Sequence, residues 1–195
     1  MEDFKCISVT RTSTKELKIN NPTHYPLIGK GEQGAVFKLS SKRCVKIYAR
    51  QKQAEMEANV YKLTQDSPII PKLYEIGSNY IIMEYIEGPT LEEYLKKKRK
   101  ISKSLTSQIL FMLKEMNHLG FTRLNVRLKH VIITKQEMLK VIDHVNSFTI
   151  KERRPIILFD KFEKLDLLHP FLKQVKKIDK EIYLEWKESM SEYFK

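Results

Sequence analysis

The chain has 195 residues, of which 42% are hydrophobic and 10% aromatic, so a disordered chain is excluded and one compact domain or two small lobes are expected. The net charge of +12 is compatible with an acidic protein, a nucleic acid, an anionic membrane or a phosphate ligand, and does not choose among them. No apolar stretch reaches the roughly 18 residues of a membrane-spanning helix. With a polar start and two cysteines in unrelated contexts, the sequence predicts a cytoplasmic protein.

The first half of the chain predicts strands with one helix. After a possible strand at 6–9, β-branched and aromatic runs at 35–39 and 44–48 predict a hairpin. A partial apolar stripe predicts a helix over 50–65. Two further strands are expected at 73–76 and 80–85.

Gly88-Pro89 breaks this pattern, and the second half is mostly helical. Helices are expected at 91–95, 104–119 and about 155–194, with short strands at 130–133 and 139–142. The fold class is therefore α+β with two lobes, 1–87 and 88–195, and a hinge near Glu87. A cleft between two lobes is a common place for a small ligand.

Residues 29–36 match the pattern G-x-G-x-x-G-x-V. Glycines allow the backbone to approach phosphate oxygens closely and to donate its N–H groups. Dinucleotide-binding folds share the pattern but follow it with a helix, whereas a strand follows here. A glycine-rich hairpin without a ligand is the alternative.

Lys46 lies among apolar neighbours on the next predicted strand, where a buried ammonium needs an anionic partner. Glu57 and Glu55, on the helix predicted at 50–65, and the phosphates of ATP are candidates. Glu57 is preferred because the apolar stripe beside it would dock the helix next to the lysine. An exposed lysine at a strand edge is the alternative.

Taken in order from Ile28 to about Phe148, over about 60% of the chain, these features resemble the protein kinase superfamily. The resemblance implies ATP and magnesium as ligands, and Lys46 and Glu57 as the ion pair that orients the phosphates. It also implies that Met83 guards the back of the pocket and that Glu84 and Ile86 present backbone groups to adenine. The implied phosphate flap comprises Ile28, Gly29, Gly31, Gly34 and Val36.

The resemblance weakens in the second half. The kinase pattern H-R-D-x-x-x-x-N aligns with 123–130, so that Asn125 replaces the catalytic aspartate and His130 replaces a magnesium-binding asparagine. The D-F-G pattern aligns with 143–145, which keeps Asp143 as a catalytic and metal-binding position. A structural role for His130 and a turn or cap role for Asp143 are the alternatives.

Asparagine can orient a hydroxyl group but cannot accept its proton, so Asn125 predicts a slow enzyme or none. The resemblance therefore implies either a weak or atypical serine/threonine protein kinase, similar to small bacterial kinases of that class, or a pseudokinase that acts as a binding module. No A-P-E-like motif follows Phe148, and a truncated helical second lobe is expected.

Basic residues suggest a partner. The run 96–100 is either a solvated helix end and loop or a docking patch for an acidic protein. Arg123, Arg127 and Lys129 around the aligned catalytic loop are either solvated or face an acidic or phosphorylated substrate. Nucleic acid is not favoured, because no aromatic platform is interleaved with the charges.

Overall fold

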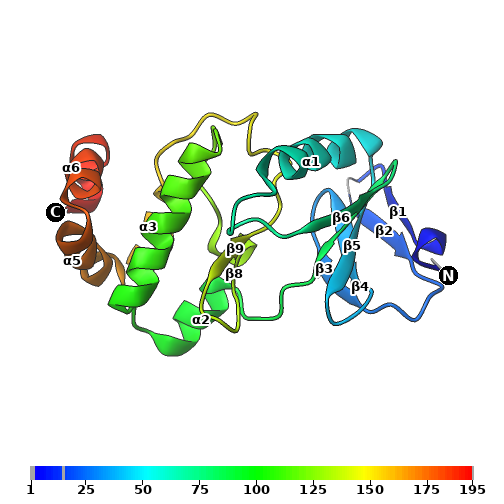
Figure 1. Ribbon diagram of the computed structural model, residues 1–195, viewed down its shortest axis with the longest axis horizontal. Coiled ribbons are helices and arrows are strands. Elements are labelled where there is room, and N and C mark those ends of the chain that lie inside the picture. Colours follow the sequence, from blue (N-terminus) through cyan, green and yellow to red (C-terminus); the bar gives the residue numbers. More distant parts are fainter. Residues whose placement is uncertain (1–2, 15, 195) are drawn as a thin grey trace. The chain divides into compact units, whose positions relative to one another are not determined.

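A computed structural model describes residues 3–14 and 16–194 (Figure 1). The fold is α+β, as predicted, and the chain divides into two compact units. The first unit comprises Met1–Ile86 with Asp143–Val145, and the second comprises Glu87–Ile142 with Asn146–Lys195. The predicted assignment of an ATP-binding lobe to 1–87 and a catalytic lobe to 88–195 stays a prediction.

An antiparallel sheet of five strands forms the centre of the first unit, in the order β3-β4-β5-β7-β6. Its strands are β3 (Leu27–Lys30), β4 (Gly34–Lys38), β5 (Arg43–Tyr48), β6 (Leu73–Ile76) and β7 (Tyr80–Glu84). The hairpin predicted from the apolar runs is the pair β4–β5, and it is confirmed.

The N-terminal segment covers part of this sheet. It consists of the 3-10 turn η1 (Asp3–Cys6) and the paired strands β1 (Ser8–Arg11) and β2 (Leu17–Asn20). The start predicted for a strand at 6–9 is wrong: the N–H of Ile7 donates to the carbonyl of Phe4 and closes the turn before β1 begins. The segment shares one core with the sheet, which contains Phe4, Ile7, Val9, Leu17, Ala35, Phe37, Val45, Ile47 and Ile82.

Helix α1 (Gln51–Thr64) confirms the helix predicted at 50–65 to within one residue at each end. Its buried residues recur every three or four positions, as expected for one face of a helix packed against β5, β6 and β7. They are Ala54, Glu57, Ala58, Val60, Tyr61 and Thr64. A fully buried glutamate in this row is the exception, and it belongs to the site described below.

The second unit is mostly helical, and side-chain caps explain where several helices begin. Thr90 and Glu93 form a capping box at α2, Ser102 caps α3, and Asp179 caps α6. The helices are α2 (Leu91–Lys98), α3 (Lys103–His118), α4 (Ile156–Glu163), α5 (Leu168–Ile178) and α6 (Lys180–Ser189). The short elements are the 3-10 turns η2 (Leu128–His130) and η3 (Ser191–Phe194) and the paired strands β8 (Val131–Ile133) and β9 (Leu139–Val141).

Within the described part of the chain, no helix is long and apolar enough to cross a membrane.

Two glycines of the 29–36 segment differ in the space around them. A Cβ added to Gly34 would lie 2.3 Å from the carbonyl oxygen of Ile47 on β5, whereas a Cβ added to Gly31 would meet nothing within 4 Å. Only a residue without a side chain allows β4 and β5 to approach each other at Gly34.

Gly34→Ala should therefore destabilise the protein by about 1–3 kcal/mol, because the backbone of β5 must move. Gly31→Ala, the matched control, should stay within about 0.5 kcal/mol of the wild type. Urea denaturation of both variants measures the difference. Equal midpoints for the two variants would contradict the packing role of Gly34.

Candidate functional site

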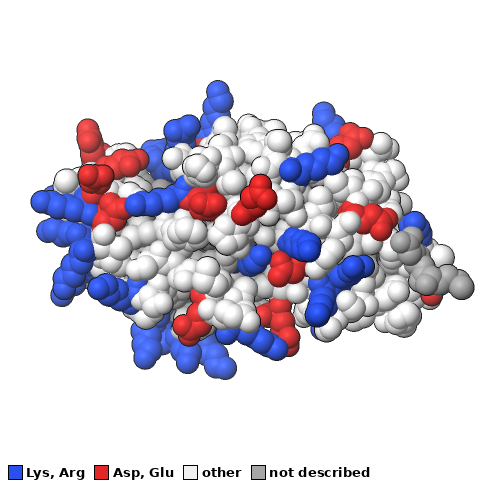
Figure 2. Space-filling view, in the orientation of Figure 1, with Lys and Arg blue, Asp and Glu red and all other residues white. Residues whose placement is uncertain are grey.

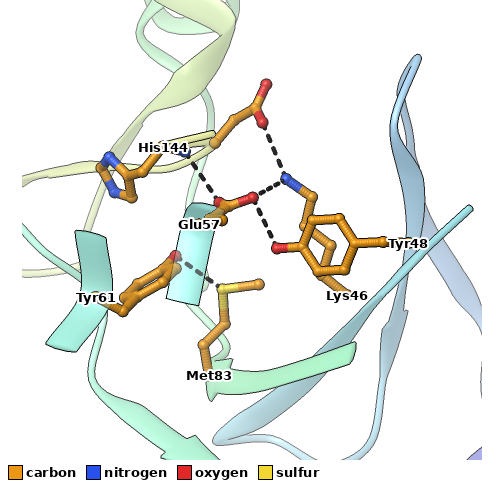
Figure 3. A network of polar contacts seen from close by, with 7 residues as sticks. Lys46, Tyr48, Glu57, Tyr61, Met83 and His144 are labelled. Carbon is orange, nitrogen blue, oxygen red and sulfur yellow. Dashed lines mark hydrogen bonds and ion pairs between the residues drawn. The ribbon is translucent and has the colours of Figure 1, made fainter. Parts of the chain in front are cut away.

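Lys46 lies inside β5 and is only 8% exposed. Its Nζ donates to Oε2 of Glu57 at 2.6 Å and to Oδ1 of Asp143 at 2.9 Å. Figure 3 shows the lysine reaching from the sheet towards the glutamate on α1. The partner preferred from the sequence is thus the one in contact, while Glu55 is exposed and accepts a hydrogen bond from Gln51.

The carboxylate of Glu57 is fully buried and accepts hydrogen bonds from three residues (Figure 3). Oε2 accepts from Lys46 and from the hydroxyl of Tyr48 at 2.7 Å. Oε1 accepts from the backbone N–H of His144 at 2.9 Å. A buried charge is tolerated when it is paired and hydrogen-bonded in this way.

The protonation states follow from the same contacts. Burial opposes the charge of Lys46, but the carboxylates of Glu57 and Asp143 outweigh it and raise the pKa of Lys46 above its usual range. Burial, with Glu57 next to the ring, raises the pKa of Tyr48 well above 10.0. Near neutral pH the lysine is therefore charged and the tyrosine is a neutral donor.

Asp143 adopts a left-handed backbone conformation, with φ of 67°. This conformation is uncommon for residues other than glycine, and aspartate is one of those that tolerate it. The side chain of Asp143 remains 35% exposed, while His144 and Val145 are buried. The rings of Tyr61 and His144 pack in a T-shaped arrangement at a centroid distance of 5.3 Å. Residues 143–145 are thus fixed within the first unit.

The glycine segment is in register with the lysine. Gly29 of β3 pairs with Val36 of β4, which pairs with Lys46 of β5. Directly paired residues of an antiparallel sheet point to the same face, so the side chains of Val36 and Lys46 lie next to each other. Gly31 donates its N–H to the carbonyl of Gly34 and closes the turn between β3 and β4. Ile28, the remaining predicted flap residue, is 43% exposed.

The predicted hinge residues have different surroundings. The sulfur of Met83 accepts a hydrogen bond from the hydroxyl of Tyr61 at 3.0 Å (Figure 3). The N–H of Glu84 is already used, since it donates to the carbonyl of Lys72. The backbone N–H and C=O of Ile86 have no hydrogen-bond partner among residues 3–14 and 16–194.

Asn125 and His130 belong to the second unit and have structural contacts there. The side-chain oxygen of Asn125 accepts a hydrogen bond from the N–H of Ile157, in the first turn of α4, at 2.7 Å. The carbonyl of His130 accepts from the N–H of Ile142 at 2.9 Å. Among the residues that the structure describes, no three or more His, Cys, Asp and Glu side chains form a protein-only metal site. The role predicted for Asp143 and His130 in holding magnesium stays a prediction.

Two contributors to the site were missed from the sequence. Tyr48 follows Lys46 by two positions on a strand, so its side chain shares a face with the lysine, and that spacing could have identified it. The backbone N–H of His144 carries no such signal, because it reaches Glu57 from 87 residues away.

No protein-family model matches the chain. It is 34% identical over 122 residues to a Bacillus subtilis protein named "Putative serine/threonine-protein kinase YrzF", covering 60% of this chain and 57% of that protein. It is 31% identical over 97 residues to "Serine/threonine-protein kinase D" of Synechocystis sp., covering 47% and 19%, respectively. The chain thus spans less than two thirds of the length of these relatives.

A solved structure, the Cydia pomonella granulovirus kinase PK-1, matches with a TM-score of 0.47 and 19% identity, over 62% of this chain and 50% of that one. The similarity to these curated kinases supports a protein-kinase-like superfamily for the chain. The resemblance predicted from the motifs is thereby confirmed.

Glu57→Ala should destabilise the protein by about 3–5 kcal/mol, because Lys46 loses its buried partner and two further donors lose their acceptor. Glu55→Ala, on the same helix but exposed, is the matched control and should change stability by less than about 0.5 kcal/mol. Denaturant unfolding measures both. A small loss for Glu57→Ala would mean that water or Asp143 replaces the carboxylate.

Proposed function

We propose that the protein binds ATP with magnesium and is a weak or atypical serine/threonine protein kinase, which transfers the γ-phosphate of ATP to a protein hydroxyl. One observation carries the proposal: Lys46 contacts both Glu57 and Asp143 and is in register with the glycine segment. The specificity for serine and threonine is supported only by the names of the curated relatives. A cytoplasmic location fits the free thiols of Cys6 and Cys44.

The residues present fit a nucleotide phosphate. A lysine ammonium has three N–H donors, and the two contacts with Glu57 and Asp143 leave one for a phosphate oxygen. The open space around Gly31 means that the packing of the protein does not itself require a glycine there. Close approach of a ligand to the backbone supplies a reason for it.

The residues present also fit a magnesium ion. Lys46, Glu57 and Asp143 together carry a net charge of −1, which favours a cation, and part of the Asp143 side chain reaches solvent. Magnesium binds carboxylate and phosphate oxygens and keeps several waters, so one carboxylate and the nucleotide suffice. The backbone N–H and C=O of Ile86 have no hydrogen-bond partner among the described residues, which supports the hinge interpretation.

When bound, ATP and magnesium supply the phosphoryl group and neutralise its charge. Asn125 can orient the substrate hydroxyl but cannot take its proton, and general-base help is typically worth about 10²–10⁴-fold in rate. Positioning and electrostatics provide most of the catalysis of phosphoryl transfer. Slow transfer is therefore compatible with Asn125.

A pseudokinase is the second candidate, and the residues that replace kinase motif residues favour it. The Asn125 side chain is bound to the N–H of Ile157, so it already has a structural use in the second unit. His130 and Val145, which replace further kinase motif residues, point the same way. Such a protein would bind ATP, or a partner, without transferring phosphate.

A thermal-shift titration with ATP, with and without magnesium, tests the binding. A ligand at 100 times its Kd stabilises the folded state by about 2.7 kcal/mol, so Tm should rise, and more so with magnesium. Gly31→Val should weaken ATP binding at least about tenfold, because its side chain fills the space that the phosphates need while the ion pair remains intact. Lys46→Ala should abolish the shift.

Lys42→Ala, in the exposed turn before β5, is the control and should bind ATP like the wild type. If Lys46→Ala fails to fold because Glu57 loses its partner, Gly31→Val still decides the question. The absence of any Tm rise with ATP, or unchanged affinity in Gly31→Val, would contradict the proposal.

Asn125→Asp should raise phosphoryl transfer by about 10²-fold or more, because aspartate adds a proton acceptor. The new carboxylate can still accept the N–H of Ile157, so the fold is expected to remain intact. Autophosphorylation measured by mass spectrometry reports the gain. Asn125→Ala is the control, because alanine can neither accept a proton nor orient the substrate hydroxyl. No gain in an Asn125→Asp protein that still binds ATP would favour the pseudokinase.

A further inference from the structure

The positive charge of the protein is concentrated in its second unit. That unit contains 23 Lys and Arg against 14 Asp and Glu, whereas the first unit contains 13 against 10. The second unit therefore carries nine of the twelve excess charges. Figure 2 shows Lys and Arg crowded over the left and lower left of the molecule, where Figure 1 has α2, α3 and α5.

Two segments about 70 residues apart contribute to this crowding. One is the basic run 96–100, with Lys103 in the first turn of α3, and the other is α5. Gln174 of α5 joins them: its Nε2 donates to the carbonyl of Ile101 at 3.0 Å, and its Oε1 accepts from the hydroxyl of Thr106 at 2.9 Å. The lysines on either side of Gln174 thus lie close to the basic run.

We define the basic face as seven exposed residues of these two segments. They are Lys97, Lys98, Arg99, Lys100, Lys103, Lys173 and Lys177.

Several cations of the same unit form ion pairs with carboxylates. Lys96 and Lys161 pair with Glu92, Lys114 pairs with Asp179, Lys135 pairs with Glu87, and Arg154 pairs with Glu152. Among the described residues, no carboxylate lies within ion-pairing distance of any member of the basic face. The charge of this face is therefore not neutralised by ion pairs with residues 3–14 and 16–194.

The helix dipole and the spacing along each helix favour a positive charge at only some positions of the basic face. Lysines in the last turn of α2 and α5 interact favourably with the helix dipole. Lys103 does the opposite, since it lies in the first turn of α3, where the dipole disfavours a cation and no acidic residue compensates. Lys173 and Lys177 are four positions apart on α5, a spacing at which like charges repel. The sequence keeps these charges at a local cost to stability.

The composition of the face indicates the class of partner. It has six lysines, one arginine and no aromatic residue, which does not suit stacking on nucleic-acid bases. Of the apolar residues beside it, Ile101 and Val175 are buried and Ile178 is only partly exposed, which does not favour insertion into a lipid surface. The lysine ammonium groups are compact point charges on flexible side chains. They can each follow the position of a carboxylate of aspartate or glutamate on a partner.

We propose that the basic face binds an acidic, Asp/Glu-rich segment of a partner protein. This interaction goes beyond the proposed function and does not require ATP, because all seven residues belong to α2, α3, α5 and the loop between α2 and α3.

Fluorescence anisotropy with a fluorescein-labelled 12-residue Asp/Glu peptide tests the proposal on the full chain. The wild type should bind, and binding should weaken as salt rises from low to physiological strength. Lys173→Glu with Lys177→Glu should weaken binding at least about tenfold. The matched control, Lys52→Glu with Lys62→Glu, makes the same charge change on two exposed lysines of α1 and should bind like the wild type.

Several outcomes would overturn the proposal. Unchanged binding in Lys173→Glu/Lys177→Glu would show that the α5 lysines do not contact the peptide. An equal loss in both double variants would show that only net charge matters. Displacement of the peptide by duplex DNA or by phosphatidylserine vesicles, at lower concentrations than unlabelled peptide, would assign the face to another class of partner. If the α5 variant does not fold, Lys98→Gln with Lys100→Gln tests the same face outside α5.

The ATP thermal shift of the α5 variant separates the two proposals. A normal ATP response with lost peptide binding supports the acidic partner independently of the proposed function. Loss of the ATP thermal shift alone would indicate damage to the nucleotide site. It would not change the conclusion about peptide binding to the basic face.

Discussion

The first unit depends on one buried ion pair, between Lys46 and Glu57. A buried carboxylate is stable only when charge and hydrogen bonds replace its water, and Glu57 receives these from β5 and from residues 143–145. The pair therefore joins α1, the central strand of the sheet and a segment that is distant in sequence. A shift of α1, β5 or residues 143–145 would leave a buried charge without a partner. The positions of these three segments are therefore coupled.

The strand pairing of the sheet sets the position of this ion pair next to the glycine segment, residues 29–36. Register places Gly29, Val36 and Lys46 side by side on three strands, and Gly34 allows β4 to approach β5 closely. Glycine is therefore present at different positions of the segment for different physical reasons. Gly34 is required by the packing of the protein against itself, whereas the surroundings of Gly31 impose no such requirement. A ligand that approaches the backbone explains Gly31 without affecting the account of Gly34.

Local patterns were enough to predict the hairpin of β4 and β5, helix α1 and the choice of Glu57 over Glu55, because each rests on periodicity over a few residues. Two of the contacts that were missed are long-range. The His144 N–H reaches Glu57 and the Asn125 side chain reaches Ile157 only through the tertiary fold, and no local pattern encodes either contact. The early strand was misplaced because the turn that closes at Ile7 depends on a backbone hydrogen bond, which side-chain patterns do not report.

The proposed nucleotide binding and the proposed phosphoryl transfer depend on different parts of this chain. Lys46, Glu57 and Asp143 are held by contacts inside the first unit, whereas Asn125 is held by Ile157 in the second. The fold does not demand an asparagine at 125, because an aspartate would accept the same N–H and would also be favoured by the N-terminal dipole of α4. The missing proton acceptor is therefore not explained by the structural use of the side chain. The absence of a proton acceptor at Asn125 affects the rate of the proposed transfer and leaves the geometry proposed for ATP unchanged.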